Sequence, residues 1–206
     1  SSIGIDPSKN VGKIANDRGL KTFIGFFDNR MIKKILKEYQ KPDLIVASSV
    51  VTHLKNPILF SKNIKQFIRK NGTLIIEIEY LQNFLKNVEY ERFYFDRPFY
   101  YSANSIKELF KNVQMKLYDI EKIGIHGGSL RFYIKNSLNC KITKRCENIL
   151  NNEKQNLNLQ TFKVFNKKIY QDSKYFKDQL IKFKKNNKKV IGYGCPARVA
   201  TITNFS

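Results

Sequence analysis

Residues 71–81 read NGTLIIEIEYL, and this stretch decides the fold class of the chain. After a glycine that ends the preceding helical pattern, the apolar run 74–78 has the length and the branched side chains of a buried β-strand. Directly before the glycine, residues 57–69 have the spacing of a helix, and Asn56 is placed to cap it. A helix followed by a buried strand is the repeating unit of an α/β protein.

Apolar runs of strand length alternate with helical patterns on both sides of this stretch. The expected strands occupy residues 2–5, 20–24, 44–47, 115–120 and 130–134. The expected helices occupy residues 11–18, 31–39 and 105–110. In the first half of the chain this alternation predicts βαβ units and a parallel sheet.

The last third of the chain has a different pattern. Residues 144–186 are rich in lysine and carry an apolar stripe, which predicts one or two long helices. Residues 189–192 predict a new strand, and the following GYGCPARVAT predicts a glycine turn and the start of a helix. We therefore expect three parts: a sheet domain at 1–139, a basic helical connector at 140–188, and the start of a second α/β domain at 189–206.

The chain has a formal net charge of +21, and residues 140–190 carry 14 basic and 4 acidic side chains. Such charge raises the hypothesis of a basic module that binds nucleic acid. Only 8 of the 38 basic residues are arginine, however, and readers of bases and phosphates depend mainly on arginine. We therefore interpret the basic segment as the solvated face of the long helices and disfavour nucleic acid as a partner.

Cysteine usage and hydropathy exclude other classes. Cys140, Cys146 and Cys195 are odd in number and lack CxxC spacing, so we expect no disulfide framework and no metal site. No apolar run is long enough to span a bilayer, and the first residues lack the pattern of a signal peptide. We expect a soluble, cytoplasmic protein that has no membrane partner.

A series of short motifs carries the chemistry. Asp6, in GIDPS, ends the first expected strand, where a carboxylate can accept hydrogen bonds from both hydroxyls of a nucleoside ribose. The motifs that follow it are GFF at 25–27, ASSVVTHLKNP at 47–57, NGTLIIEIEYL at 71–81, HGGSLRFYI at 126–134 and GYGCPARVAT at 192–201. In this order the series resembles the nucleotide-sugar C-methyltransferase family over nearly the whole chain.

The resemblance implies a Rossmann-like methyltransferase sheet and S-adenosylmethionine as the cofactor. It also implies methyl transfer to a nucleotide-activated sugar, or to a group linked to a sugar, in surface-polysaccharide or deoxysugar biosynthesis. Two departures lead us to expect part of a longer enzyme. The zinc-binding module of the family is absent, and so are the first strand and its glycine-rich loop. A non-catalytic scaffold, or one half of a split enzyme, remains an alternative.

The resemblance also implies roles for single residues. The residues matched to the cofactor site are Asp6, Phe26, Phe27, Ser48 and His53. Those matched to the substrate site are Glu77, Glu79, Tyr80, Arg97, Gly127, Gly128, Ser129, Arg131 and Tyr193. Three simpler interpretations stay open: core packing for the two phenylalanines, an ordinary loop residue for His53, and a structural salt bridge at Arg131.

The expected catalytic residues are Tyr94, Asp96 and His126. Where the family has a Tyr-His-Glu-His run, this chain reads Tyr94, Phe95, Asp96 and Arg97, so both imidazoles are lost. Methylation of carbon needs a base beside a keto group, and arginine cannot serve as one at neutral pH. The acceptor atom is therefore open between carbon and oxygen, and the replaced run slightly favours oxygen.

Overall fold

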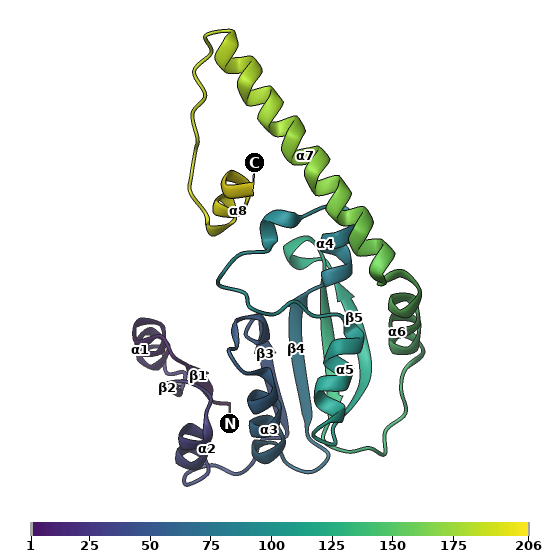
Figure 1. Ribbon diagram of the computed structural model, residues 1–206. Helices are drawn as coiled ribbons and strands as arrows, with labels where there is room; N and C mark the ends of the chain where they lie inside the picture. The colour runs from purple at the N-terminus through teal and green to yellow at the C-terminus, as the bar shows by residue number, and fades with distance from the viewer. Residues whose placement is uncertain (1, 206) are drawn as a thin grey trace.

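The computed structural model describes residues 2–205, and Figure 1 shows a layer of strands with helices packed beside it. The strands are β1 (Gly4–Asp6), β2 (Thr22–Ile24), β3 (Leu44–Ser48), β4 (Thr73–Glu79), β5 (Lys116–Ile123) and β6 (Ser129–Lys135). The α-helices are α1 (Lys9–Asp17), α2 (Asn29–Ile35), α3 (Pro57–Phe67), α4 (Leu81–Asn87), α5 (Ala103–Lys111), α6 (Lys144–Asn156), α7 (Leu159–Lys185) and α8 (Ala197–Phe205). Short 3-10 helices are η1 (Val51–His53), η2 (Tyr90–Arg92) and η3 (Ile125–Gly127). The predicted α/β class is confirmed.

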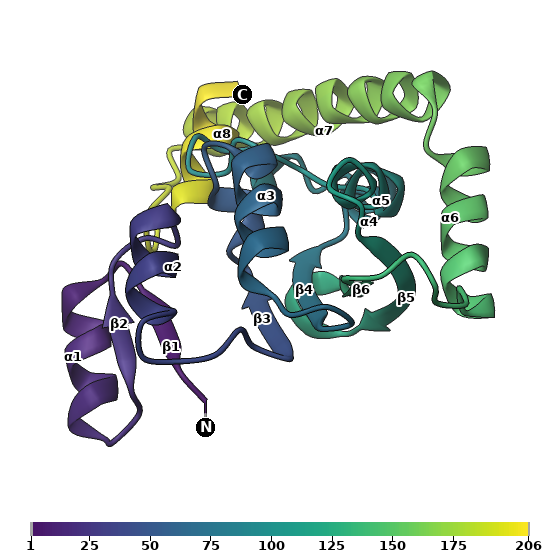
Figure 2. The same ribbon diagram turned by 90° about the horizontal axis from the view of Figure 1, so that it is seen from below.

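The pairing of the strands divides them into two sheets. β1 pairs with β2 and β3 pairs with β4, both in parallel, as the alternation of strands and helices predicts. β6 lies between β4 and β5 and runs antiparallel to both. Among the described strands, β1 and β3 share no pairing, and Figure 2 shows β1 on the side of β2 nearer to β3. The Rossmann-like sheet is therefore interrupted between β1 and β3.

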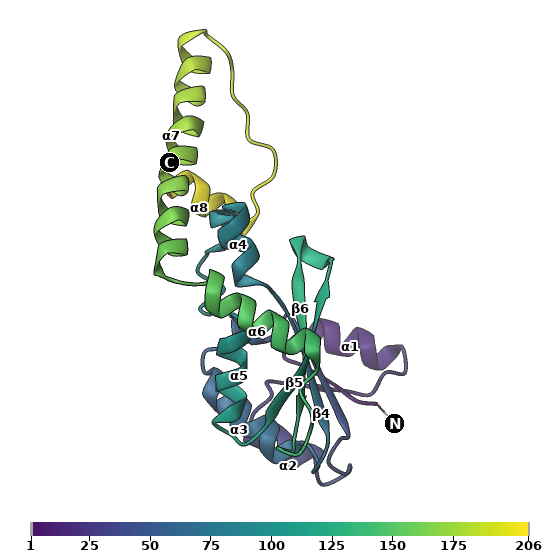
Figure 3. The same cartoon turned by 90° about the vertical axis from the view of Figure 1, so that its right-hand side faces the viewer.

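The main core lies on one face of the larger sheet. Figure 3 shows α3 and α5 on this face and α1 on the opposite side. Because side chains alternate along a strand, Leu74, Ile76 and Ile78 of β4 all point into the core, and all are buried. On β3, Leu44 and Val46 belong to the other face and are 53% and 60% exposed.

Most α-helices begin where a short polar side chain can accept a hydrogen bond from a free main-chain N–H. Asn56, the predicted cap of α3, accepts one from Leu59 N at 2.9 Å. The helices capped in the same way begin after Ser8, Asp28, Ser102, Thr143 and Asn158. Local chemistry therefore sets the starts of these helices.

The segment predicted to form one or two long helices forms two, α6 and α7, and Glu153 of α6 is buried. Its carboxylate accepts hydrogen bonds from the main-chain N–H groups of Ala103 and Asn104 at the start of α5. The strand expected at 189–192 is wrong: this segment has no regular structure, and Val190 and Ile191 are exposed. A strand needs a paired neighbour for its main chain, and none of the described strands pairs with this segment. The predicted helix start is confirmed as α8.

Within residues 2–205, no helix is both long enough and apolar enough to cross a membrane.

Candidate active site

The carboxyl ends of the parallel strands lie at one edge of the sheets, which is where open α/β sheets bind ligands. Figure 1 shows the segment between α4 and α5 crossing above the ends of β3 and β4. This segment contains Tyr94–Arg97, and the β5–β6 turn with its two glycines lies close to it. Residues from the separate stretches 47–57, 71–81, 94–97 and 126–134 therefore lie at this edge.

Asp6 and Phe26 lie at neighbouring strand ends, because the N–H of Gly25 donates to the carbonyl of Asp6 at 2.9 Å. One carboxylate oxygen of Asp6 accepts from Ser8 N at 2.7 Å, which orients the side chain. Phe26 is 75% exposed. A carboxylate and an exposed aromatic ring at adjoining strand ends offer contacts suited to a ribose and an adenine.

Phe27 differs from its neighbour because it packs into the core. Its ring meets Phe60 and Phe67 edge-on, with centroid distances of 5.8 and 5.6 Å. The open interpretation of core packing therefore describes Phe27 and does not describe Phe26.

A polar row crosses the larger sheet on the face opposite to α3 and α5. Ser48 donates to Glu77 at 3.3 Å, and Arg131 Nε donates to the other oxygen of Glu77 at 2.5 Å. Arg131 Nη1 also contacts Glu121 at 3.2 Å. The hydrogen bond to Glu77 raises the pKa of the Arg131 guanidinium. The structure thus contains the structural salt bridge that the sequence left open for Arg131.

Glu79 is at the end of β4 and is buried in an ionic cluster. Arg97 Nη1 lies 2.7 Å from Glu79 Oε1, and Arg92 Nη1 lies 3.9 Å from the same oxygen. Arg92 also contacts Glu89 through Nε. Several polar atoms of the cluster, among them Arg97 Nε and Glu79 Oε2, are buried with no hydrogen-bond partner among the described residues. Arg97 is therefore held by a carboxylate of its own chain.

Gly127 lies against this cluster, and Gly128 lies against Asn83. A Cβ atom on Gly127 would lie 2.9 Å from Arg92 Nη2, and one on Gly128 would collide with Asn83 Nδ2. Both glycines also have positive φ angles, +79° and +108°. The sequence anticipated a close approach here. The groups approached in the structure are side chains of the same chain.

His53 and Asp96 come together although 43 residues separate them. His53 Nδ1 lies 2.9 Å from the main-chain oxygen of Asp96 and 3.4 Å from its carboxylate Oδ2. Beside them, the guanidinium of Arg97 lies 5.4 Å from the ring centroid of Tyr94. Four of the predicted site residues, His53, Tyr94, Asp96 and Arg97, thus share one location.

Among the described residues, Tyr80, Ser129, His126 and Tyr193 form no hydrogen bond or ion pair with these four residues. Tyr80 is buried, and its hydroxyl donates to Gln82 at 2.5 Å. Burial raises the pKa of Tyr80, and the carboxylate of Glu153 acts in the same direction. Ser129 donates to the carbonyl of Ile125 at 3.1 Å. His126 is exposed in the β5–β6 turn, and Tyr193 is fully exposed between α7 and α8.

Sequence reasoning missed Arg92, Glu89 and Glu153. Arg92 and Glu153 are buried charged residues, and Arg92 contacts Glu89. In a lysine-rich chain a charged residue is expected to lie in solvent. No local sequence pattern distinguishes the buried Arg92 and Glu153 from the exposed charged residues. The one sequence signal that could have pointed to Arg92 is its position two residues before Tyr94, an expected catalytic residue.

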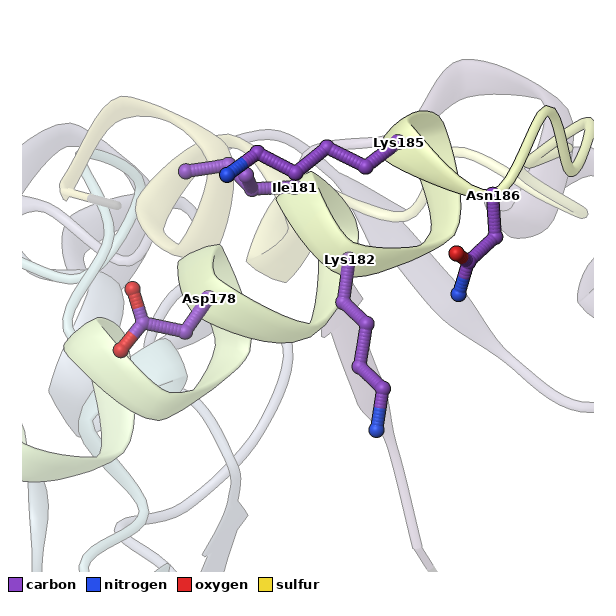
Figure 4. Close-up of a pocket in the computed structure, with 5 residues that line it drawn as sticks. All are labelled: Asp178, Ile181, Lys182, Lys185 and Asn186. Atoms are coloured by element: carbon purple, nitrogen blue, oxygen red, sulfur yellow. The ribbon is translucent and has the colours of Figure 1, made fainter.

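A surface hollow lies elsewhere, at the free end of α7. Figure 4 shows its lining residues, Asp178, Ile181, Lys182, Lys185 and Asn186. All of them come from one helix and its C-cap, and the hollow contains none of the predicted site residues. It plays no part in the candidate site.

Residues 1–120 match the methyltransferase domain family, and residues 124–206 match the family described as C-methyltransferase C-terminal domain. The C-methyltransferase NovU of Streptomyces niveus is 24% identical over 128 residues, which cover 62% of this chain and 30% of NovU. An uncharacterized protein of Methanocaldococcus jannaschii is 29% identical over 119 residues, which cover 55% of each chain. The chain thus spans about a third to a half of the length of these relatives.

Two solved structures have a similar fold. A SAM-dependent methyltransferase from Thermotoga maritima has a TM-score of 0.54 at 17% identity, over 66% of this chain and 73% of the other. A SAM-dependent methyltransferase from Methanosarcina mazei has a TM-score of 0.51 at 10% identity, over 66% of this chain and 82% of the other. At these identities the likeness concerns the fold alone.

Proposed function

This chain belongs to the methyltransferase domain family, and from that premise we propose that it serves methyl transfer from S-adenosylmethionine to a nucleotide-activated sugar or a sugar-linked group. The family implies this cofactor, which supplies an electrophilic methyl group when it is bound. The proposal rests on one arrangement: the carboxylate of Asp6 and the exposed ring of Phe26 at adjoining strand ends.

The residues present fit the adenosine half of the cofactor. Asp6 would accept hydrogen bonds from the ribose hydroxyls, and Phe26 would cover one face of the adenine. Ser48 and the loop after it lie at the carboxyl end of β3, in the larger sheet. The fit concerns this half alone, because the motifs matched above do not include a glycine-rich loop for the methionine half.

The match of residues 124–206 and the name of the relative from Streptomyces niveus both support carbon as the acceptor atom. The loss of both imidazoles in 94–97 supports oxygen. We propose carbon, because the imidazole of His53, which contacts Asp96, can take the proton that carbon methylation releases. The sugar nucleotide itself is supported by the order of the sequence motifs.

The test is to incubate the full-length protein with methyl-labelled S-adenosylmethionine and a panel of keto-sugar nucleotides. Mass spectrometry should find a labelled sugar nucleotide whose added methyl group resists mild acid and is located on carbon by NMR. Calorimetry should show binding of S-adenosylhomocysteine. If the protein binds neither S-adenosylmethionine nor S-adenosylhomocysteine at millimolar concentration, the proposed function is wrong.

A further inference from the structure

The contact between His53 and Asp96 selects one form of the imidazole. A carbonyl oxygen can only accept a hydrogen bond, so the 2.9 Å contact with the main-chain oxygen of Asp96 requires a proton on Nδ1 of His53. The neutral ring then carries no proton on Nε2. Its free lone pair is the feature that a general base needs.

The carboxylate of Asp96 supports the same role. Oδ2 lies 3.4 Å from Nδ1 of His53, so a negative charge faces the protonated side of the ring. When Nε2 takes a proton, the ring becomes an imidazolium, and a neighbouring carboxylate stabilises that cation. The carbonyl oxygen of Asp96 therefore orients the imidazole of His53, and the carboxylate stabilises the imidazolium that forms when the ring takes a proton.

Both partners are held by buried groups. His53 ends η1, in which Val51 and Thr52 are buried, and the hydroxyl of Tyr101 donates to the carbonyl of Val51 at 3.4 Å. Asp96 directly precedes Arg97, whose guanidinium is fixed to the buried Glu79. The ring of His53 remains 37% exposed at the edge of the sheet. A substrate can thus reach a side chain whose position is fixed.

We infer that His53 is the general base of the proposed methyl transfer and that Asp96 is its positioning residue. This inference rests on the proposed function. In the step, Nε2 of neutral His53 forms an N–H bond while the C–H bond beside the keto group of the acceptor breaks. The electron pair of that bond stays on the acceptor as an enolate, and the ring becomes an imidazolium.

The inference changes three sequence-based assignments. His53 moves from the cofactor site to the acid–base role, and Asp96 moves from base to positioning residue. His126, the other expected base, lies exposed in the β5–β6 turn with a left-handed backbone, φ 54°. Among the residues that the structure describes, none orients the His126 ring as Asp96 orients that of His53.

The first test measures the tautomer and needs no substrate. In a long-range ¹⁵N–¹H correlation spectrum of the labelled full-length protein, the imidazole signals lost in His53→Gln and in His126→Gln identify these two residues. We expect His53 mainly as the Nδ1–H form at pH 8. Free imidazole side chains prefer the Nε2–H form, so finding that form at His53 would overturn the inference whatever the turnover.

The second test measures turnover. His53→Ala should lower the rate of methyl transfer by about 100-fold or more, and added imidazole should restore part of it. The affinity for S-adenosylmethionine should stay within about twofold of the wild type, since the base role predicts a loss in rate and not in binding. Asp96→Asn should lower the rate while leaving the Nδ1–H form in place, because the main-chain oxygen remains.

Lys55→Ala, an exposed change two residues away, is the matched control and should leave the rate unchanged. The outcomes separate the two proposals. If wild-type protein neither binds the cofactor nor methylates, the proposed function fails. The tautomer measured at His53 then still tests the geometry inferred for that residue. If His53→Ala turns over like the wild type, the inference fails while the function stands.

Discussion

Arg97 Nη1 lies 2.7 Å from Glu79 Oε1, and the two side chains are 11% and 4% exposed. A guanidinium at the edge of an α/β sheet is a common binder of phosphate. Here its charge is already neutralised by a carboxylate from the end of β4. A substrate phosphate would have to compete with that carboxylate. We therefore expect this ion pair to contribute to the stability of the fold.

Glu79→Gln should lower the free energy of unfolding by about 3–5 kcal/mol, because it leaves a buried guanidinium without its counter-charge. Urea unfolding followed by circular dichroism measures this. Asp43→Asn is the matched control: it breaks the exposed pair between Asp43 and Arg69 and should cost at most about 1 kcal/mol. Equal effects of the two changes would show that Glu79 is not buried with Arg97.

Phe26→Ala and Phe27→Ala should separate binding from stability, although the residues are neighbours. Phe27 packs against Phe60 and Phe67, so its removal should destabilise the protein by about 3 kcal/mol. Phe26 is exposed, so its removal should leave stability nearly unchanged and weaken cofactor binding by about 1 kcal/mol. Thermal unfolding and calorimetry measure the two effects. The reverse pattern would remove Phe26 from the cofactor site.

Asp6→Ala should weaken the binding of S-adenosylmethionine to the full-length protein by about 2 kcal/mol, the contribution of a hydrogen bond to a charged group. Calorimetry measures the dissociation constant. Asp17→Ala changes an exposed carboxylate at the end of α1 and should have no effect. A dissociation constant for Asp6→Ala that equals the wild-type value would exclude Asp6 from the site.

Asp119 should make stability depend on pH in the acid range. Hydrogen bonding and charge from Arg145, together with Thr143, lower the pKa of Asp119 below its usual value near 3.8. The folded state then binds fewer protons than the unfolded state, so stability falls as the pH falls through the usual pKa and below it. Urea unfolding at pH 6 and pH 3 should show a larger loss for the wild type than for Asp119→Asn. A loss of the same size in both proteins would contradict this origin.

Patterns of neighbouring residues determined much of this fold. The apolar runs that became β3 and β4, the cap at Asn56 and the stripe along α7 depend on residues within a few positions of one another. The segment 189–192 shows the limit of such reasoning. It has the composition of a strand, but a strand forms only where another main chain can pair with it, and that depends on the rest of the structure.

The sequence by itself determined the alternation of strands and helices, the positions of the caps and the carboxyl ends of the strands near which Asp6, Phe26 and His53 lie. These follow from local periodicity and from the rule that parallel strands share one carboxyl edge. Only the tertiary structure decided that His53 meets Asp96 and that Glu79 holds Arg97. Such contacts join residues far apart in the chain, and their energies depend on burial and distance, which one-dimensional patterns do not contain.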